Sequence, residues 1–160
     1  AGITTGQVVD AGVRDSMNMG AAMAPAAFHT VMQNLKDLEI TKEQLEGGWY
    51  DKIITGDLGK IGKQALADLL RNEGLEAEGF LMDCGVEIYD NQKQDTHAGG
   101  SGCGCSAVVL ASYILPKIVS GEWKRILFVP TGALLSKVSF NEGDSIPGIA
   151  HGVVIEHMEV

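Results

Sequence analysis

Short apolar runs separated by amphipathic segments constrain the fold of this chain most strongly. "YDKIITG" (50–56) is a short apolar run that ends in glycine, and "RILFVP" (125–130) is an apolar run that ends in proline. Apolar runs of this length, bounded by turn residues, predict strands inside a sheet. Helical patterns lie between them, so the order of elements predicts a mixed α/β sheet with helices packed on it.

Helical periodicity predicts a first long helix in the Ala- and Met-rich stretch early in the chain. Phe28, Val31, Met32 and Leu35 follow the spacing i, i+3, i+4 and i+7, which places them on one helical face. Pro25 is expected in the first part of this helix, where its missing N–H costs least.

Two further helices carry start and stop signals. Thr41 and Gln44 in "TKEQ" have the spacing of a capping box, which predicts a short helix. "KIGKQALADLLRNEG" (60–74) predicts a longer helix, with Gly74 as its C-terminal cap. The residues expected on its apolar side are Ile61, Ala65, Leu66, Leu69 and Leu70.

The segment Cys105–Val119 is apolar nearly all the way round, which predicts a buried helix that Pro116 kinks or shortens. "TGQVVDAGV" (5–13) predicts a strand, as does "GIAHGVVIEHMEV" (148–160) at the end of the chain. The stretch 79–90, with "GFLMD" and "VEIYD", is consistent with either a strand or an irregular insertion.

Composition limits the classes of partner. The 160 residues correspond to one domain, and their formal net charge of -9 argues against binding to nucleic acid or to an anionic membrane surface. No segment approaches the roughly 20 apolar residues that a spanning helix needs. Three cysteines do not form a disulfide framework, and they favour a reducing compartment. The first residue is not Met, so the chain is expected to be a fragment.

The glycine-rich stretch "AGGSGCGCS" (98–106) is the strongest candidate site. Its glycines Gly99, Gly100, Gly102 and Gly104 permit positive φ and close approach of a ligand, and the helix that follows would present N–H groups to a carboxylate or phosphate. A tight loop that only lets a buried helix pack is equally consistent with the pattern. The spacing fits neither the dinucleotide fingerprint nor the phosphate-binding P-loop.

The positions of the cysteines and histidines raise two possibilities, zinc binding and nucleophilic catalysis. Cys103 and Cys105 with His97 and the distant Cys84 do not make the paired ligand sets of a zinc site, so the thiols are expected to be packing groups and no metal is predicted. Alternatively, Cys103 or Cys105 at a helix N-terminus would have a lowered pKa and act as a nucleophile, with His97 or His151 as base.

Three other polar residues are ambiguous. Asp57 follows a predicted strand, where α/β proteins often bind ligands, but it is also placed to cap the next helix. His29, within an amphipathic helix, and His157, near the end, are expected to be structural or solvated.

Four segments together resemble one family. "VVDAGVRDSMNMGAAMAPAA" (8–27), "IITGDLGKIGK" (53–63), "AGGSGCGCSAVV" (98–109) and "PTGALLS" with "SIPGIAHGVVIE" (130–156) resemble the C-terminal half of the stage V sporulation protein AD family. That family is similar in fold to thiolases and β-ketoacyl synthases, which are built from two related halves. The resemblance implies that residues 1–160 form a single thiolase-like C-terminal domain whose N-terminal half is missing.

The resemblance also bears on catalysis. The acylated cysteine of thiolases lies in the first half, so it is none of the three cysteines here. Gly56 and Asp57 stand where the second half of a thiolase supplies a histidine, Gly99–Ser101 stands at the second catalytic position, and "PTGALLS" lacks the late cysteine. The chain is therefore expected not to be an enzyme. The alternative is an acyl-thioester condensing enzyme or acyltransferase with the glycine loop facing coenzyme A.

The function that the resemblance implies is binding of dipicolinic acid, a flat dianion, during its uptake into the spore and its release at germination. The expected ligand-binding residues are Gly99, Gly100, Ser101 and His151. The expected partners are other spore-membrane proteins of the same operon, the missing N-terminal half and a second copy in a homodimer, with no cofactor and no nucleic acid. The resemblance places the protein in the spore or forespore, peripherally associated with the inner membrane.

Overall fold

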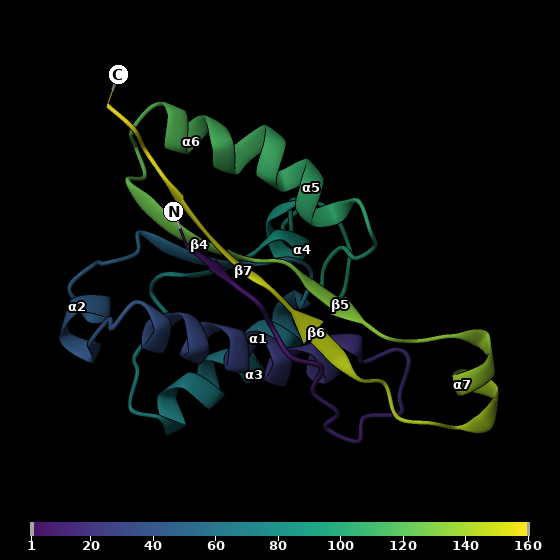
Figure 1. The fold of residues 1–160 in the computed structure, drawn as a ribbon. Coiled ribbons are helices and arrows are strands. Elements are labelled where there is room, and N and C mark those ends of the chain that lie inside the picture. Colours follow the sequence, from purple (N-terminus) through teal and green to yellow (C-terminus); the bar gives the residue numbers. More distant parts are fainter. Residues whose placement is uncertain (1, 160) are drawn as a thin grey trace.

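A mixed five-stranded sheet forms the centre of the computed structural model, which describes residues 2–159 (Figure 1). The strand order is β1-β7-β4-β2-β3, in which β2 runs parallel to β3 and β4, and β7 runs antiparallel to β4 and β1. The strands are β1 (Ile3–Thr4), β2 (Lys52–Thr55), β3 (Leu81–Asp83), β4 (Arg125–Val129) and β7 (Gly152–Glu156). The predicted mixed α/β sheet, including its two central apolar strands, is confirmed.

Helices cover both faces of the sheet and create two separate cores (Figure 1). One face carries α1 and α3, and the other carries a continuous helical segment made of α5, η1 and α6. The helices are α1 (Met19–Asp37), α2 (Lys42–Glu46), α3 (Gly59–Asn72), α4 (Cys84–Glu87), α5 (Cys105–Val109), the π-helical η1 (Leu110–Ile114), α6 (Leu115–Val119) and α7 (Lys137–Glu142). Thr41 caps α2 through the predicted capping box with Gln44.

The predicted apolar face of α1 is confirmed, since Val31 and Leu35 are buried and Phe28 and Met32 pack against the same core. Pro25 does lie early in α1, but the helix already starts at Met19, so Pro25 falls beyond the first turn, where its missing N–H would have cost least.

Near its N-terminus, α1 crosses α3 at a very short distance. A Cβ atom on Gly20 would lie 2.1 Å from the carbonyl oxygen of Leu58, and one on Gly62 would lie 2.8 Å from backbone atoms of Gly20. The backbones therefore touch at this crossing, and only glycine permits that distance. This contact fixes the first turn of α1 against α3.

The C-terminal end of α3 matches its prediction, because Gly74 follows the helix with φ +79. Its predicted apolar side is only partly right. Leu66 and Leu70 are fully buried, but Ile61 is 59% exposed. Since α3 approaches α1 through Gly62, the buried stripe is rotated away from Ile61.

Two strand predictions need correction. Only Ile3–Thr4 pairs in a strand, whereas residues 5–13 contribute a single bridge between Val9 and Gly148. The chain leaves the sheet at Gly6, which packs so closely on the carbonyl of Ala150 that a Cβ would lie 1.4 Å from its oxygen. The predicted strand 148–160 is split by His151 into β6 (Gly148–Ala150) and β7, and residue 160 lies outside the described part of the chain.

The ambiguous stretch 79–90 resolves into the short strand β3 followed directly by α4. A small two-stranded arm, β5 (Thr131–Ala133) paired with β6, carries α7 away from the body of the molecule (Figure 1).

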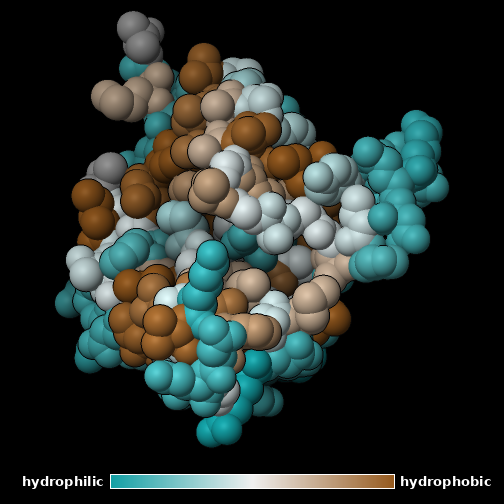
Figure 2. Space-filling model, turned by 90° about the vertical axis from the view of Figure 1, so that its right-hand side faces the viewer, coloured by the Kyte–Doolittle hydropathy of each residue, from teal (hydrophilic) through white to brown (hydrophobic). Residues whose placement is uncertain are grey.

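The segment Cys105–Val119 is helical but not buried all round, so that prediction is wrong. Its inner face contributes Cys105, Val109, Ile114 and Ile118 to the second core, while its outer face is exposed. Apolar outer residues include Val108, 53% exposed, and Val119, 78% exposed. Figure 2 shows apolar surface in the upper part of the molecule, at the height of α5 and α6 in Figure 1, and again in its lower part.

Pro116 neither ends nor sharply divides this helical segment. The turn before it is the π-helical η1, and α6 continues through Pro116. A π-helical turn shifts the hydrogen-bonding pattern locally, which accommodates the proline without ending the helix. Among residues 2–159, no helix is both long enough and apolar enough to cross a bilayer.

Candidate functional site

Three segments singled out in the sequence meet at the carboxylate of Asp57. One oxygen, Oδ1, accepts a hydrogen bond from the Thr131 hydroxyl at 3.1 Å, and the other, Oδ2, accepts one from the backbone N–H of Gly102 at 3.2 Å. The backbone N–H of Asp57 in turn donates to Thr131 Oγ1 at 3.3 Å. Asp57 thus joins the end of β2, the start of β5 and the glycine loop. It does not cap α3, whose N-cap residue is Leu58.

A second carboxylate, Asp83, lies at the end of β3 and is fully buried. Its Oδ1 accepts from the Thr55 hydroxyl at 2.6 Å and from the Leu58 N–H at 2.8 Å. Its Oδ2 accepts from the N–H groups of Gly59 at 2.9 Å and Val86 at 3.2 Å. One side chain therefore satisfies donors from β2, from the start of α3 and from α4.

Burial raises the pKa of the Asp83 carboxyl, and the neighbouring charge of Asp57 raises it further, while the hydrogen bonds it accepts from Thr55 and the start of α3 act in the opposite direction. Sequence reasoning missed both Asp83 and Thr131. The available signal was a polar residue directly after an apolar strand, at the carboxyl end where ligand sites of α/β sheets form.

Two of the predicted ligand-binding glycines serve the packing of loops. The N–H of Gly99 donates to Thr96 O at 2.9 Å, and the N–H of Gly100 donates to Gly85 O at 2.6 Å. A Cβ on Gly99 would lie 2.6 Å from the Gly85 oxygen, and one on Gly100 would lie 2.6 Å from the Tyr89 ring. Glycine is required at both positions by contacts within the chain. At Gly99 and Gly100 the structure therefore favours the tight-loop interpretation.

The rest of the glycine loop borders a shallow pocket of about 280 Å³. Gly102 and Gly104 differ from the two preceding glycines, because no atom lies within 4 Å of where their Cβ atoms would be. Ser101 is exposed and also lines the pocket. The lining residues are Ile88, Tyr89, Gly100, Ser101, Gly102, Cys103, Gly104, Cys105 and Val108. We name this hollow the loop pocket.

His151 lies between β6 and β7, and its hydrogen bonds are made with residues outside the glycine loop. Its Nδ1 accepts the backbone N–H of Gly6 at 3.0 Å, and its own N–H donates to Pro130 O at 3.3 Å. Among residues 2–159, no hydrogen bond joins His151 to residues 99–101. Its role as a ligand-binding residue stays a prediction.

The cysteines occupy different environments, with Cys84 and Cys105 buried and Cys103 exposed. Burial raises the pKa of the Cys84 thiol to about 12. Burial also raises the pKa of Cys105, and the carboxylates of Asp57 and Asp83 add to that effect. The prediction of a lowered pKa at Cys105 is wrong, because burial and two nearby negative charges outweigh the helix N-terminus.

The remaining histidines lie away from the loop pocket. His97 is exposed and its Nδ1 lies 3.1 Å from Asp95 Oδ1. His157 Nδ1 is 2.7 Å from the carbonyl oxygen of Ile118, and His29 is half-buried in α1. Within residues 2–159, no group of three or more His, Cys, Asp or Glu side chains is arranged to hold a metal ion.

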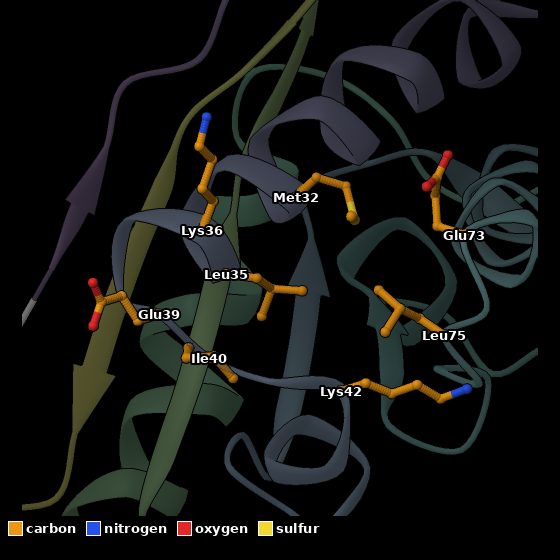
Figure 3. Close-up of a pocket in the computed structure, with 8 residues that line it drawn as sticks. All are labelled: Met32, Leu35, Lys36, Glu39, Ile40, Lys42, Glu73 and Leu75. Carbon is orange, nitrogen blue, oxygen red and sulfur yellow. The ribbon is translucent and has the colours of Figure 1, made fainter.

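A second hollow, of about 320 Å³, lies at the opposite end of the sheet, where α1 and α3 end and the parallel strands begin (Figure 3). Figure 3 shows Met32, Leu35 and Leu75 turned toward one another, whereas Lys36 and Glu39 point away. The charged residues Lys42 and Glu73 also line this hollow. The candidate site is the carboxyl end of the sheet, around the loop pocket, because the Asp57 carboxylate and the glycine loop meet there.

Comparison with known proteins gives a consistent family. The family model of stage V sporulation protein AD matches residues 1–156. The curated stage V sporulation protein AD of Bacillus subtilis (strain 168) is 44% identical over 153 residues, which is 96% of this chain. The chain spans 44% of the length of that relative. A match over nearly the whole chain, at this identity, shows that the chain belongs to the stage V sporulation protein AD family.

Proposed function

We propose that this sporulation protein binds dipicolinic acid (pyridine-2,6-dicarboxylate) and serves the machinery that takes the compound up into the spore and releases it at germination. The family match over residues 1–156 is the observation that carries this proposal. Family membership supports a role in sporulation, and the ligand follows from the function that the resemblance implies.

The site geometry supports binding over condensing chemistry. Asp57, at the position of a thiolase histidine, has both carboxylate oxygens engaged by Thr131 and Gly102. Acid–base catalysis needs a side chain free to exchange a proton with the substrate. A hydrogen-bonded carboxylate that joins three segments acts instead as a support for the pocket above it. The raised pKa of Cys105 points the same way, since a protonated thiol is a poor nucleophile.

We further propose that the chain works as one half of a two-half protein. Beyond the loop pocket, the outer face of the segment Cys105–Val119 exposes apolar residues such as Leu115 and Val119, which a companion half would cover. Thiolase-like halves pack in this way, and the relative from Bacillus subtilis is more than twice as long as this chain. In this proposal the full-length protein associates peripherally with the spore inner membrane, alongside other products of its operon.

Calorimetry tests the proposal directly. Dipicolinic acid is titrated into this chain and into the full-length protein, with benzoate as a monocarboxylate control. Saturable binding by the full-length protein that benzoate does not reproduce is the expected result. Binding by neither protein refutes the proposal. Turnover of an acyl-coenzyme A thioester by the full-length protein would favour the alternative, a condensing enzyme or acyltransferase.

A further inference from the structure

We propose that the loop pocket receives the uncharged edge of the aromatic ring of its ligand, so that the carboxylates of the ligand point out of the pocket. The inference rests on the proposed function and names the part of the ligand that this chain recognises. Pyridine-2,6-dicarboxylate suits such a division, because one edge of the ring bears both carboxylates and the ring nitrogen, and the opposite edge bears only C–H groups.

A negative charge lies beside the loop pocket. Oδ2 of the Asp57 carboxylate lies 3.2 Å from the nitrogen of Gly102, and Gly102 lines the pocket. That hydrogen bond directs the Gly102 donor toward Asp57 instead of toward a ligand. Asp83 lies near enough for its carboxyl group to interact electrostatically with that of Asp57. A carboxylate placed in the pocket would meet like charge, whereas a C–H edge would not.

Part of the lining of the loop pocket is apolar. Ile88, Tyr89 and Val108 line one side of the pocket, and the exposed parts of Tyr89 and Val108 are 40% and 53%. These aliphatic and aromatic surfaces are available to a ligand, and an aromatic ring packs favourably against both kinds of group. Tyr89 is held in place because its ring packs on Gly100.

Two glycines of the loop pocket have free space where a Cβ atom would be. Outside each glycine and its chain neighbours, no atom lies within 4 Å of the Cβ positions of Gly102 and Gly104, and both glycines line the pocket. Gly104 has φ -92, a conformation that alanine also adopts. Neither local crowding nor backbone conformation therefore requires glycine at this position. Glycine at position 104 would leave space for the edge of the ligand's aromatic ring.

Binding measurements on the full-length protein test the orientation in two independent ways. The first compares dipicolinic acid with its 4-phenyl derivative, whose added ring extends from the edge that the pocket would receive. The second compares Gly104→Ala with Gly79→Ala. Gly79 is the matched control, because its Cβ position is also open but it lies outside the loop pocket. Circular dichroism verifies that both variants fold.

We expect the 4-phenyl derivative to bind at least about tenfold more weakly than dipicolinic acid, because a small misfit in an apolar pocket has an effect of this order. Gly104→Ala should weaken dipicolinic acid binding to a similar degree, and Gly79→Ala should leave it unchanged. Equal binding of the two ligands, or unchanged binding by Gly104→Ala, would overturn the inference while the proposed function stands. Absence of dipicolinic acid binding by the wild-type protein would overturn both.

Discussion

Replacing the buried carboxylate of Asp83 by alanine is expected to destabilise the fold strongly. The Asp83 side chain accepts hydrogen bonds from the Thr55 hydroxyl and from the backbone N–H groups of Leu58, Gly59 and Val86. Alanine removes the acceptor and leaves these donors facing a small cavity. Because the residue is fully buried, bulk water does not replace the missing bonds.

The magnitude follows from the number of donors. A buried donor that loses its partner costs about 1 to 3 kcal/mol. Three of the donors are buried, and the fourth, on Val86, is only partly buried. We expect Asp83→Ala to lower the free energy of unfolding by about 4 kcal/mol, a large share of the about 5 to 15 kcal/mol typical of a domain. Asp83→Asn keeps one acceptor oxygen and avoids burying a charge, so we expect a smaller loss, of about 2 kcal/mol.

Equilibrium denaturation in urea, followed by circular dichroism and by tryptophan fluorescence, measures these losses. Asp10→Ala is the control, because Asp10 also accepts hydrogen bonds, from Gly12 and Ser145, but is exposed to water. Its loss should stay below about 1 kcal/mol. A loss for Asp83→Ala no larger than that for Asp83→Asn or Asp10→Ala would refute the reasoning.

The same group gives a pH dependence with a definite sign. Since burial raises the pKa of Asp83 in the folded state, the folded protein holds this proton more tightly than the unfolded chain does. The contribution of Asp83 to stability is therefore full below its unfolded pKa and declines as pH rises through the folded pKa. The stability difference between wild type and Asp83→Asn should narrow over that window. A difference that widens with rising pH would contradict the assigned direction.

Three further predictions concern local packing and reactivity. Thr41→Ala removes the capping box of α2 and should cost about 1 kcal/mol in urea denaturation, and an unchanged midpoint would argue against the cap. Gly62→Ala forces a Cβ against the backbone of α1 and should cost about 2 kcal/mol despite the better helix propensity of alanine, whereas Gly79→Ala, with open space, should cost less than half of that. Cys103 should react with a maleimide in the native protein, while Cys84, buried and with its pKa raised to about 12, should react only on unfolding; rapid labelling of both would contradict the assigned burial.

Elements with strong local signals could be predicted from the sequence. The central strands β2 and β4, the capping box at Thr41 and the glycine that ends α3 were all recognised, because each depends on residues within one turn or one short run. The stretch 5–13 has a strand-like composition but pairs only at Val9. Its course depends on the close contact between Gly6 and Ala150, which are far apart in the chain.

The candidate site shows the same division. The sequence could place Asp57 and the glycine loop each near the end of a predicted element, but it did not single out Thr131 and could not show that the three meet. Their contact through the Asp57 carboxylate joins residues 45 and 74 positions apart. The local pattern also suggested that Cys105 at a helix start would have a lowered pKa. The opposite shift arises from burial and from the carboxylates of Asp57 and Asp83, which are distant in the sequence.

By itself, the sequence determined the α/β class, the principal helices, the central strands and, through its resemblance, the family. These rest on periodicity and on motifs that are complete within short segments. Only the tertiary structure decided at which glycines a neighbouring loop occupies the Cβ position and at which glycines that position is open. This depends on atoms brought together from distant parts of the chain. The tertiary structure also decided that the outer face of the segment Cys105–Val119 is exposed. The hydrophobic composition of a segment shows that its surface favours burial. Whether other elements of the same chain bury that surface depends on how those elements pack.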